Sequence, residues 1–270
     1  MLLVTLVRLK TGISSEAAAF LFGVSEAVIS RTFESGLLHV YHCFKVLFKP
    51  PTLEMMARTC SAKFKSRFKA QGGYIIDCSD LECEIGTDPQ VRYATYSDYH
   101  NFNGVKFLGA FSFCGAFVFS SHGYNARASD NAVTELSGFL DILERGMTVL
   151  ADRGFTIFYL LGKIGVTLYI PPFRKKTVND ARIEKTDDYC FSKEDSKLTH
   201  KVANLRIHCE RGFGRTKHFA IFDRPIPMSM LDLATPMFYV CSMLTNLQLP
   251  LVANLNKNLY SDNLIPVNSK

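Results

Sequence analysis

The stretch Gly73-Tyr74-Ile75-Ile76-Asp77-Cys78 predicts a short buried strand with a carboxylate near its end. An aspartate inside such an apolar run is costly to desolvate unless it is paired, hydrogen-bonded or bound to a metal. The stretch therefore predicts both the first strand of a sheet and a position where a carboxylate has a specific role.

The residues after this strand predict a mixed sheet packed between helices. Val105–Phe111 and Phe117–Ser121 are β-rich runs around Cys114-Gly115, which indicates a hairpin. An amphipathic helix over 131–144 follows, with Ser129 or Asp130 as its cap. Strands are expected at 148–151 and 166–170, and a polar loop at 175–198. The last elements are a helix at 199–220 and an apolar helix at 228–247 that Pro236 starts or kinks. This order predicts an α/β fold, an RNase H-like mixed sheet flanked by helices.

A small all-α region precedes the sheet. Leu2, Leu3, Leu6 and Leu9 recur at helical spacing until Gly12, a second helix follows Ser14 or Ser15 and stops at Gly23, and a third begins after Ser25. The residues expected to pack the last two helices together are Ala18, Leu21, Val24, Val28 and Ile29. This pattern is typical of a helix-turn-helix, and a plain αα-corner that binds no DNA is the alternative.

The start of the second helix of such a motif enters the major groove of DNA. The outward-facing residues there are Ser25, Glu26, Ser30 and Arg31, which we expect to contact base edges or phosphates. A basic linker follows, with Phe64 and Phe68 expected to anchor it to the body. Its cationic side chains either follow a phosphate backbone or are merely solvated.

Composition and charge narrow the classes of protein. Hydrophobic residues make up 47% and charged residues 21% of the 270, which excludes disorder, collagen and coiled coil as the main state. The formal charge of +6 arises in residues 1–70, which hold ten Lys/Arg and four Asp/Glu, while the remainder is balanced. A basic end joined to a neutral body predicts an anionic partner, with a plain solvated surface as the alternative.

The cysteines and the apolar runs predict a soluble intracellular protein. None of the eight cysteines forms a CxxC pair, which favours free thiols in a reducing compartment. The start MLLVTLV is interrupted by Arg8 and resembles no signal peptide, and no apolar run is long enough to span a bilayer.

Two further acids complete a candidate metal site. Asp152 directly follows the strand Val149-Leu150-Ala151, and Glu210 lies in HCERGFGRTK. Ligands in α/β sheets bind at the carboxyl ends of strands, and carboxylates from separate elements can hold two Mg²⁺ ions for phosphoryl displacement. The alternatives are Asp77 hydrogen-bonded within the sheet, Asp152 as a cap or turn residue, and Glu210 paired with Arg206 or Arg211.

Spaced motifs along nearly the whole chain carry a family resemblance. The segments are IIDCSDLECE (75–84), YSDYHNFNGVKFLGAFSFCG (96–115), ASDNAVTELSGFLDILERG (128–146), VLADRGF (149–155) with YIPPF (169–173), LRIHCERGFGRTKHF (205–219) and SMLTNLQLPLV (242–252). With these motifs the chain resembles the DDE transposases of the PIF/Harbinger superfamily and the Harbinger-derived nuclease-like proteins of animals. One departure is Ser79-Asp80, where the family often has Thr-Glu.

The resemblance implies an RNase H-like fold and a triad of Asp77, Asp152 and Glu210 that holds two divalent ions, Mg²⁺ or Mn²⁺. It also implies double-stranded DNA as substrate, action in the nucleus with the cytoplasm as a second location, and a Myb/SANT-like companion protein. A homodimer is compatible with it. The expected division is a helix-turn-helix over 1–47, a basic linker over 48–72, a catalytic domain over 73–252 and a tail over 253–270.

Two functions follow from these features. The first is a metal-dependent DNA endonuclease or transposase-like enzyme, in which cations hold phosphates or the developing charge. The candidate cations are Lys106, Arg153, Arg211, Arg215 and Lys217, for each of which a salt bridge within the protein is the alternative. The second is a domesticated DNA-binding protein that no longer cuts.

Overall fold

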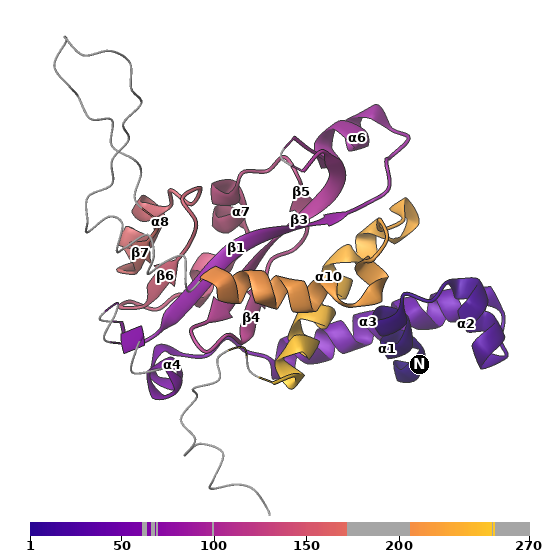
Figure 1. Cartoon of the computed structure of the whole chain (residues 1–270), viewed down its shortest axis with the longest axis horizontal. Helices are drawn as coiled ribbons and strands as arrows, with labels where there is room; N and C mark the ends of the chain where they lie inside the picture. Colours follow the sequence, from indigo (N-terminus) through magenta and orange to yellow (C-terminus); the bar gives the residue numbers. More distant parts are fainter. Residues whose placement is uncertain are drawn as a thin grey trace, which may run out of the picture.

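A mixed sheet forms the centre of the molecule (Figure 1). The computed structural model describes residues 1–60, 64, 65, 68, 70–98, 100–171, 206–249 and 251. The strands are β1 (Gly73–Glu82), β2 (Tyr96–Ser97), β3 (Phe102–Ser112), β4 (Phe117–Ser120), β5 (Tyr124–Asn125), β6 (Thr148–Leu150) and β7 (Thr167–Tyr169). Their order is β2-β3-β1-β6-β7, with β4 and β5 paired to β3.

Strand β1 joins the two halves of this sheet. It pairs antiparallel with β3 and parallel with β6, which in turn pairs parallel with β7. The predicted hairpin is β3 and β4, which pair antiparallel. The predicted fold class, an RNase H-like mixed sheet flanked by helices, is confirmed.

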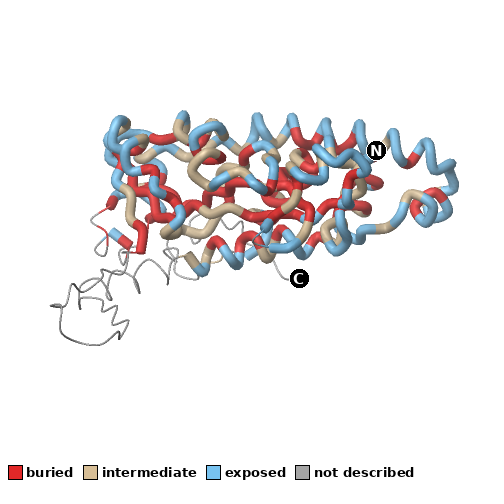
Figure 2. The backbone as a smooth tube through the Cα atoms, turned by 90° about the horizontal axis from the view of Figure 1, so that it is seen from above, coloured by how far each residue is buried: buried red, intermediate tan, exposed pale blue. Residues whose placement is uncertain are grey.

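Helices cover both faces of the sheet because the side chains of β1 alternate between two cores. Tyr74 and Ile76 belong to the core that contains Phe139 of the segment after α7, and Ile75 belongs to the core that contains Phe238 of α10. The first face is covered by α7 (Asp130–Leu136) and α8 (Phe158–Ile164), and the second by α10 (Ala234–Leu244) and a helix described over 206–217. Figure 2 shows the buried backbone running through the middle of the molecule.

Two long helices predicted from the sequence are each divided. The helix expected over 131–144 is α7 followed by the 3-10 helix η1 (Phe139–Ile142), because Gly138 adopts the left-handed conformation with φ of 79°. The helix expected over 228–247 consists of η3 (Met228–Leu233), α10 and η4 (Thr245–Leu247). Pro236 lies in the first turn of α10, where a missing N–H is tolerated. The expected loop at 175–198 lies outside the described residues.

The N-terminal region consists of α1 (Leu2–Thr11), α2 (Ser15–Phe22) and the long α3 (Glu26–Leu47). Gly12 and Gly23 end the first two helices in the left-handed conformation, with φ of 61° and 65°. Ser14 caps α2, because its hydroxyl oxygen accepts a hydrogen bond from Ala17 N at 3.1 Å. These helix ends are as the sequence predicts.

The contact between α2 and α3 differs from the prediction in part. Ala18 and Ile29 are buried in a small core of their own, as expected. Leu21, Val24 and Val28 are exposed by 61%, 42% and 39%, so the expectation that they pack the helices together is wrong. The small side chains of Ala18 and its neighbour Ala19 form the contact instead, and they leave the other apolar side of α2 in solvent.

The N-terminal helices pack against the body of the protein. Tyr41 of α3 lies edge-on to Tyr239 of α10, with ring centroids 5.1 Å apart. Gly12 lies against the 3-10 helix η2 (Ala220–Phe222) so closely that an added Cβ would stand 2.4 Å from Ala220 O. The backbone at the end of α1 therefore lies in direct contact with the backbone of η2.

The segment between α3 and β1 is tied down by aromatic side chains. Phe64 and Phe68 are 3% and 4% exposed, which confirms the prediction that they anchor the linker. Phe64 stacks on Phe113, and Phe68 contacts Tyr169 of β7 edge-on. The segment also contains α4 (Leu53–Thr59), and α6 (Pro89–Thr95) follows β1; the sequence reading predicts neither helix.

The Gly12 contact predicts a difference between two glycine substitutions. We expect Gly23→Ala to cost about 1 kcal/mol, because an L residue is strained at this φ but meets no atom within 4 Å. Gly12→Ala should cost about 1–3 kcal/mol more, because its methyl group also clashes with the body. Urea unfolding of both variants measures the difference, and equal costs would contradict the fitted contact.

Candidate active site

Asp77 lies near the middle of β1, opposite Gly109 of β3. Its side chain is 20% exposed, and its Oδ1 accepts a hydrogen bond from Cys78 N at 3.0 Å. Burial raises the pKa of the Asp77 carboxyl, and the nearby Arg206 opposes that rise. The carboxylate is therefore held inside the protein by a specific cation rather than by solvent alone.

Asp152 stands at the matching position beside the neighbouring parallel strand. Ile75 of β1 is in register with Leu150, the last residue of β6. Asp77 and Asp152 each follow these partners by two residues, so the register places them side by side on the same face of the sheet. Asp152 also begins a turn, since its carbonyl accepts a hydrogen bond from Phe155 N at 3.1 Å.

Arg206 joins the two aspartates. Its Nη2 is 3.2 Å from Asp77 Oδ2, and its Nη1 is 2.9 Å from Asp152 Oδ1. The guanidinium comes from the helix over 206–217, which Cys209 attaches to β1 through a hydrogen bond from Sγ to Ile75 O at 3.5 Å. Three separate elements thus meet at one shared cation, a role that the sequence reading missed because it considered Arg206 only as a partner for Glu210.

Glu210 lies one helical turn after Arg206 and is exposed. Arg206 forms its ion pairs with the two aspartates, so it is not the Glu210 partner that one reading of the sequence suggested. Within the described part of the chain, no three His, Cys, Asp or Glu side chains are close enough together to hold a metal ion. The triad of Asp77, Asp152 and Glu210 therefore stays a prediction, of which the structure brings the first two together.

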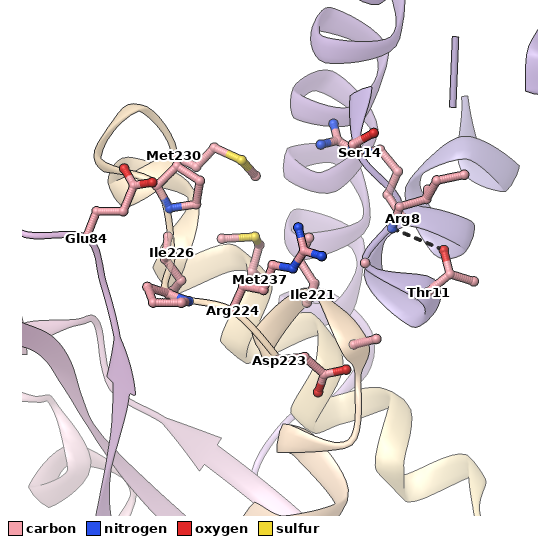
Figure 3. A pocket seen from close by; sticks show the side chains of 15 residues that line it. Arg8, Thr11, Ser14, Glu84, Ile221, Asp223, Arg224, Ile226, Met230 and Met237 are labelled. Atoms are coloured by element: carbon pink, nitrogen blue, oxygen red, sulfur yellow. Dashed lines mark hydrogen bonds between the residues drawn. The ribbon is translucent and has the colours of Figure 1, made fainter. Parts of the chain in front are cut away.

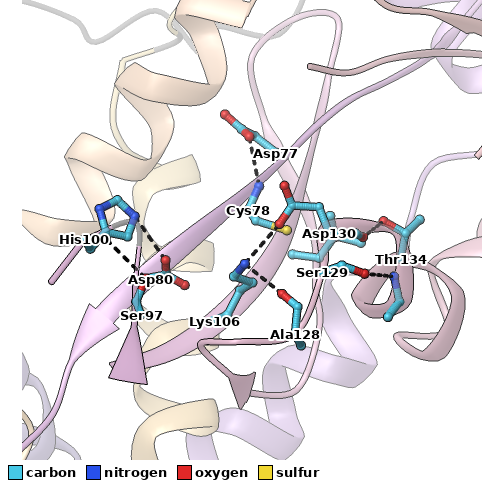
Figure 4. A network of polar contacts seen from close by, with 12 residues as sticks. Asp77, Cys78, Asp80, Ser97, His100, Lys106, Ala128, Ser129, Asp130 and Thr134 are labelled. Carbon is cyan, nitrogen blue, oxygen red and sulfur yellow. Dashed lines mark hydrogen bonds and ion pairs between the residues drawn. The ribbon is translucent and has the colours of Figure 1, made fainter. Parts of the chain in front are cut away.

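A second polar network occupies the other side of β1 (Figure 4). Lys106 of β3 donates to Ala128 O at 2.8 Å and pairs with Asp130 Oδ1 at 3.2 Å. Asp80, which is 9% exposed, pairs with His100 Nε2 at 3.1 Å. Burial raises the pKa of the Asp80 carboxyl, against the opposing effect of Lys106. This network fixes β1 to its neighbours next to the aspartate pair.

The cations predicted to contact phosphates differ in how far they are already bonded or buried within the protein. The Lys106 side chain is 15% exposed, and its ammonium is used within the protein. Arg215 donates from Nη1 to Leu249 O at 2.7 Å, and Arg153 is half-buried. Arg211 and Lys217 are exposed on the helix that carries Arg206. Burial lowers the pKa of the Lys217 ammonium, with Asp80 opposing that effect, so Arg211 is the predicted cation left most open to a large anion.

The predicted DNA-reading residues lie at the far end of the molecule from β6 and β7, where α2 meets the start of α3 (Figure 1). Ser25 is the N-cap residue of α3. Glu26, Ser30 and Arg31 are exposed on its first turns, with Ser30 Oγ 3.5 Å from Ser15 Oγ and Arg31 Nε donating to Ala27 O at 3.2 Å. These side chains are accessible to a partner.

No helix in the described ranges is long and apolar enough to cross a membrane.

Comparison with known sequence families gave two matches. The model of a family described as DDE superfamily endonuclease matches residues 76–246, a range that contains Asp77, Asp152, Arg206 and Glu210. The model described as helix-turn-helix of DDE superfamily endonuclease matches residues 1–44, which cover α1, α2 and most of α3. Comparisons with curated proteins and with solved structures gave no match.

The shared cation predicts a stability effect at the aspartate pair. With divalent cations removed by EDTA, we expect Arg206→Gln to lower the free energy of unfolding by about 1–3 kcal/mol, because the shielded carboxylate of Asp77 and the half-exposed carboxylate of Asp152 lose their shared partner. The matched control is Arg211→Gln, an exposed residue of the same helix, whose effect should stay within about 0.5 kcal/mol. Equal effects in chemical unfolding would show that the bridge contributes nothing.

Proposed function

Because the chain belongs to the DDE superfamily endonucleases, we propose that it is a metal-dependent nuclease of the transposase type that binds and cleaves double-stranded DNA. The observation that carries the proposal is the pair of Asp77 and Asp152, aligned on neighbouring parallel strands and sharing one cation. The family match supplies the class of reaction, and this pair supplies a place for it.

The donor set of the site fits hard divalent cations. Asp77, Asp152 and Glu210 all offer carboxylate oxygens, the ligands that Mg²⁺ and Mn²⁺ prefer. The guanidinium of Arg206 lies between two of the carboxylates, which marks a position where positive charge is favourable. A bound pair of such ions supplies activation of the attacking water or 3′-hydroxyl and stabilisation of the departing oxygen.

The protein's own residues position these groups. Asp77 is fixed by the sheet on both sides of β1, and Asp152 by the turn after β6. Glu210 would complete the site from the helix over 206–217. Arg211 and Lys217 on this helix would attract the DNA backbone. Lys106 is left out of this DNA surface because its ammonium is already bonded within the protein.

The helix-turn-helix would hold the DNA while the acidic site acts on it. Ser25, Glu26, Ser30 and Arg31 are exposed at the start of α3, the helix that reads the groove in such motifs. Within the superfamily, the motifs favour the PIF/Harbinger group. With that membership we propose action in the nucleus, a Myb/SANT-like companion protein and a homodimeric assembly.

One observation favours a second function, that of a DNA-binding protein that no longer cuts. Arg206 already forms an ion pair with both aspartates, and the described residues contain no group of three ligating side chains close enough together for a metal ion. A protein whose acids serve only this ion pair would keep the fold and the helix-turn-helix without catalysis. The two functions differ in whether divalent ions are needed, because only the nuclease requires them for its reaction.

The nuclease proposal predicts nicking of supercoiled plasmid DNA that depends on Mg²⁺ or Mn²⁺. Asp152→Asn should reduce the rate at least about 100-fold, because the amide is a poor ligand for a hard cation. The control is Asp141→Asn, an exposed aspartate of η1, which should cut normally. Nicking that persists in Asp152→Asn would overturn the site, and no nicking by the unmodified protein would favour the non-cutting function.

The helix-turn-helix proposal predicts that Arg31→Ala weakens duplex binding about 5- to 50-fold and lowers the slope of log affinity against log salt by about one. Lys45→Ala, at the exposed C-terminal end of the same helix, is the control and should have a smaller effect. Fluorescence anisotropy over a salt series measures both. An equal loss in the two variants would indicate only general attraction between charges.

A further inference from the structure

A cavity of about 740 Å³ lies between the N-terminal helices and the body, apart from the aspartate pair. One side is formed by the end of α1 and the start of α2, and the other by the segments around η2 and η3 (Figure 3). Its volume lies within the range of pockets that bind small molecules. Neither the family resemblance nor the acidic site accounts for it.

Arg8 of α1 lines this cavity and is the reason to expect a ligand. The residue is 6% exposed, and its Nε is buried without a hydrogen-bond partner. Within the described part of the chain its guanidinium has neither an ion pair nor a hydrogen bond, and its close neighbour is the ring of Phe33 at 4.3 Å. Burial accordingly lowers the pKa of Arg8. A buried cation without an anion is costly. A ligand that brought a negative charge next to Arg8 would therefore be stabilised by it.

The start of α2 adds further donors on the same side. Ser14 lines the cavity as the N-cap of this helix, and its hydroxyl oxygen accepts from Ala17 N, which leaves the hydroxyl proton to be donated. The N-terminus of a helix favours an anion through its free N–H groups and its dipole. A guanidinium, a hydroxyl and a helix N-terminus together are a typical set of phosphate donors.

The body side of the cavity differs in character. Ile221, Met230 and Met237 give it apolar walls, and the exposed Arg224 stands at its rim. Glu84 and Asp223 also line it, and Glu84 is tied to the body by a hydrogen bond from Met228 N at 3.1 Å. These carboxylates keep an anion away from the body side, so its place is at the Arg8 end.

We propose that the cavity binds a nucleoside phosphate, with the phosphate at Arg8 and the start of α2 and the nucleoside against the apolar walls. The volume is too large for phosphate alone, and the polar and apolar sides match the two parts of such a ligand. The ligand is either one nucleotide of a bound DNA strand or a free nucleotide. Only the DNA source rests on the proposed function, because the cavity makes no use of the aspartate pair.

The test is thermal unfolding of the full chain with deoxyadenosine monophosphate, deoxyadenosine or inorganic phosphate. We expect the monophosphate to raise the melting temperature more than either part alone. Arg8→Gln should weaken its binding at least tenfold and leave the ligand-free protein as stable as before, since it removes an unpaired buried charge. Lys10→Gln, an exposed cation of the same helix, is the matched control and should bind normally.

Anisotropy with duplex DNA separates the two sources. Weaker DNA binding by Arg8→Gln, with competition from the monophosphate, assigns the cavity to a DNA nucleotide. Unchanged DNA binding with loss of the monophosphate effect assigns it to a free nucleotide. Asp152→Asn should keep the monophosphate effect, so failure of the nuclease proposal leaves this one standing.

A melting temperature that does not respond to the monophosphate, together with DNA binding that does not depend on Arg8, would overturn the proposal. If Arg8→Gln does not fold, Ser14→Ala takes its place, because this exposed N-cap residue is the other assigned phosphate donor and its loss costs only about 1 kcal/mol. The monophosphate effect should then fall, and an undiminished effect would also overturn the proposal.

Discussion

The structure depends on one constraint, that two carboxylates on adjacent parallel strands must share a cation. Asp77 and Asp152 stand at equivalent positions because β1 and β6 are in register, and like charges so placed repel. Arg206 relieves this repulsion from a third element, the helix over 206–217. The order of strands, the packing of that helix and the candidate site are therefore aspects of the same arrangement.

Strand β1 holds this site firmly because each of its two faces packs into a separate hydrophobic core. Ile75 on one face and Ile76 on the other belong to separate cores, so the strand is held from both sides. Beyond them, the network of Asp80, His100 and Lys106 occupies the side opposite Asp77. A strand fixed in this way holds Asp77 in place.

The sequence was sufficient where local chemistry decides the structure. The strand around Asp77, the hairpin and the helix ends at Gly12 and Gly23 follow from apolar runs and glycine. The exposure of Leu21 and the role of Arg206 depend on contacts between distant segments, which periodicity does not record. Asp77 and Asp152 could be named as site residues, but their pairing required the register of β1 and β6.

Arg206 and Arg8 are both largely shielded from solvent, and they differ in whether the protein supplies an anion for the guanidinium. Arg206 and Arg8 both lose solvent on folding, and the same physical cost applies to each. Arg206 offsets this cost with two carboxylates of its own chain, so its position is explained by the fold. Arg8 meets an aromatic ring and an open cavity instead, and a ring stabilises a guanidinium far less than an anion does. The proposed ligand would supply the anion that Arg8 lacks, at the junction between the helix-turn-helix region and the body that matches the endonuclease family.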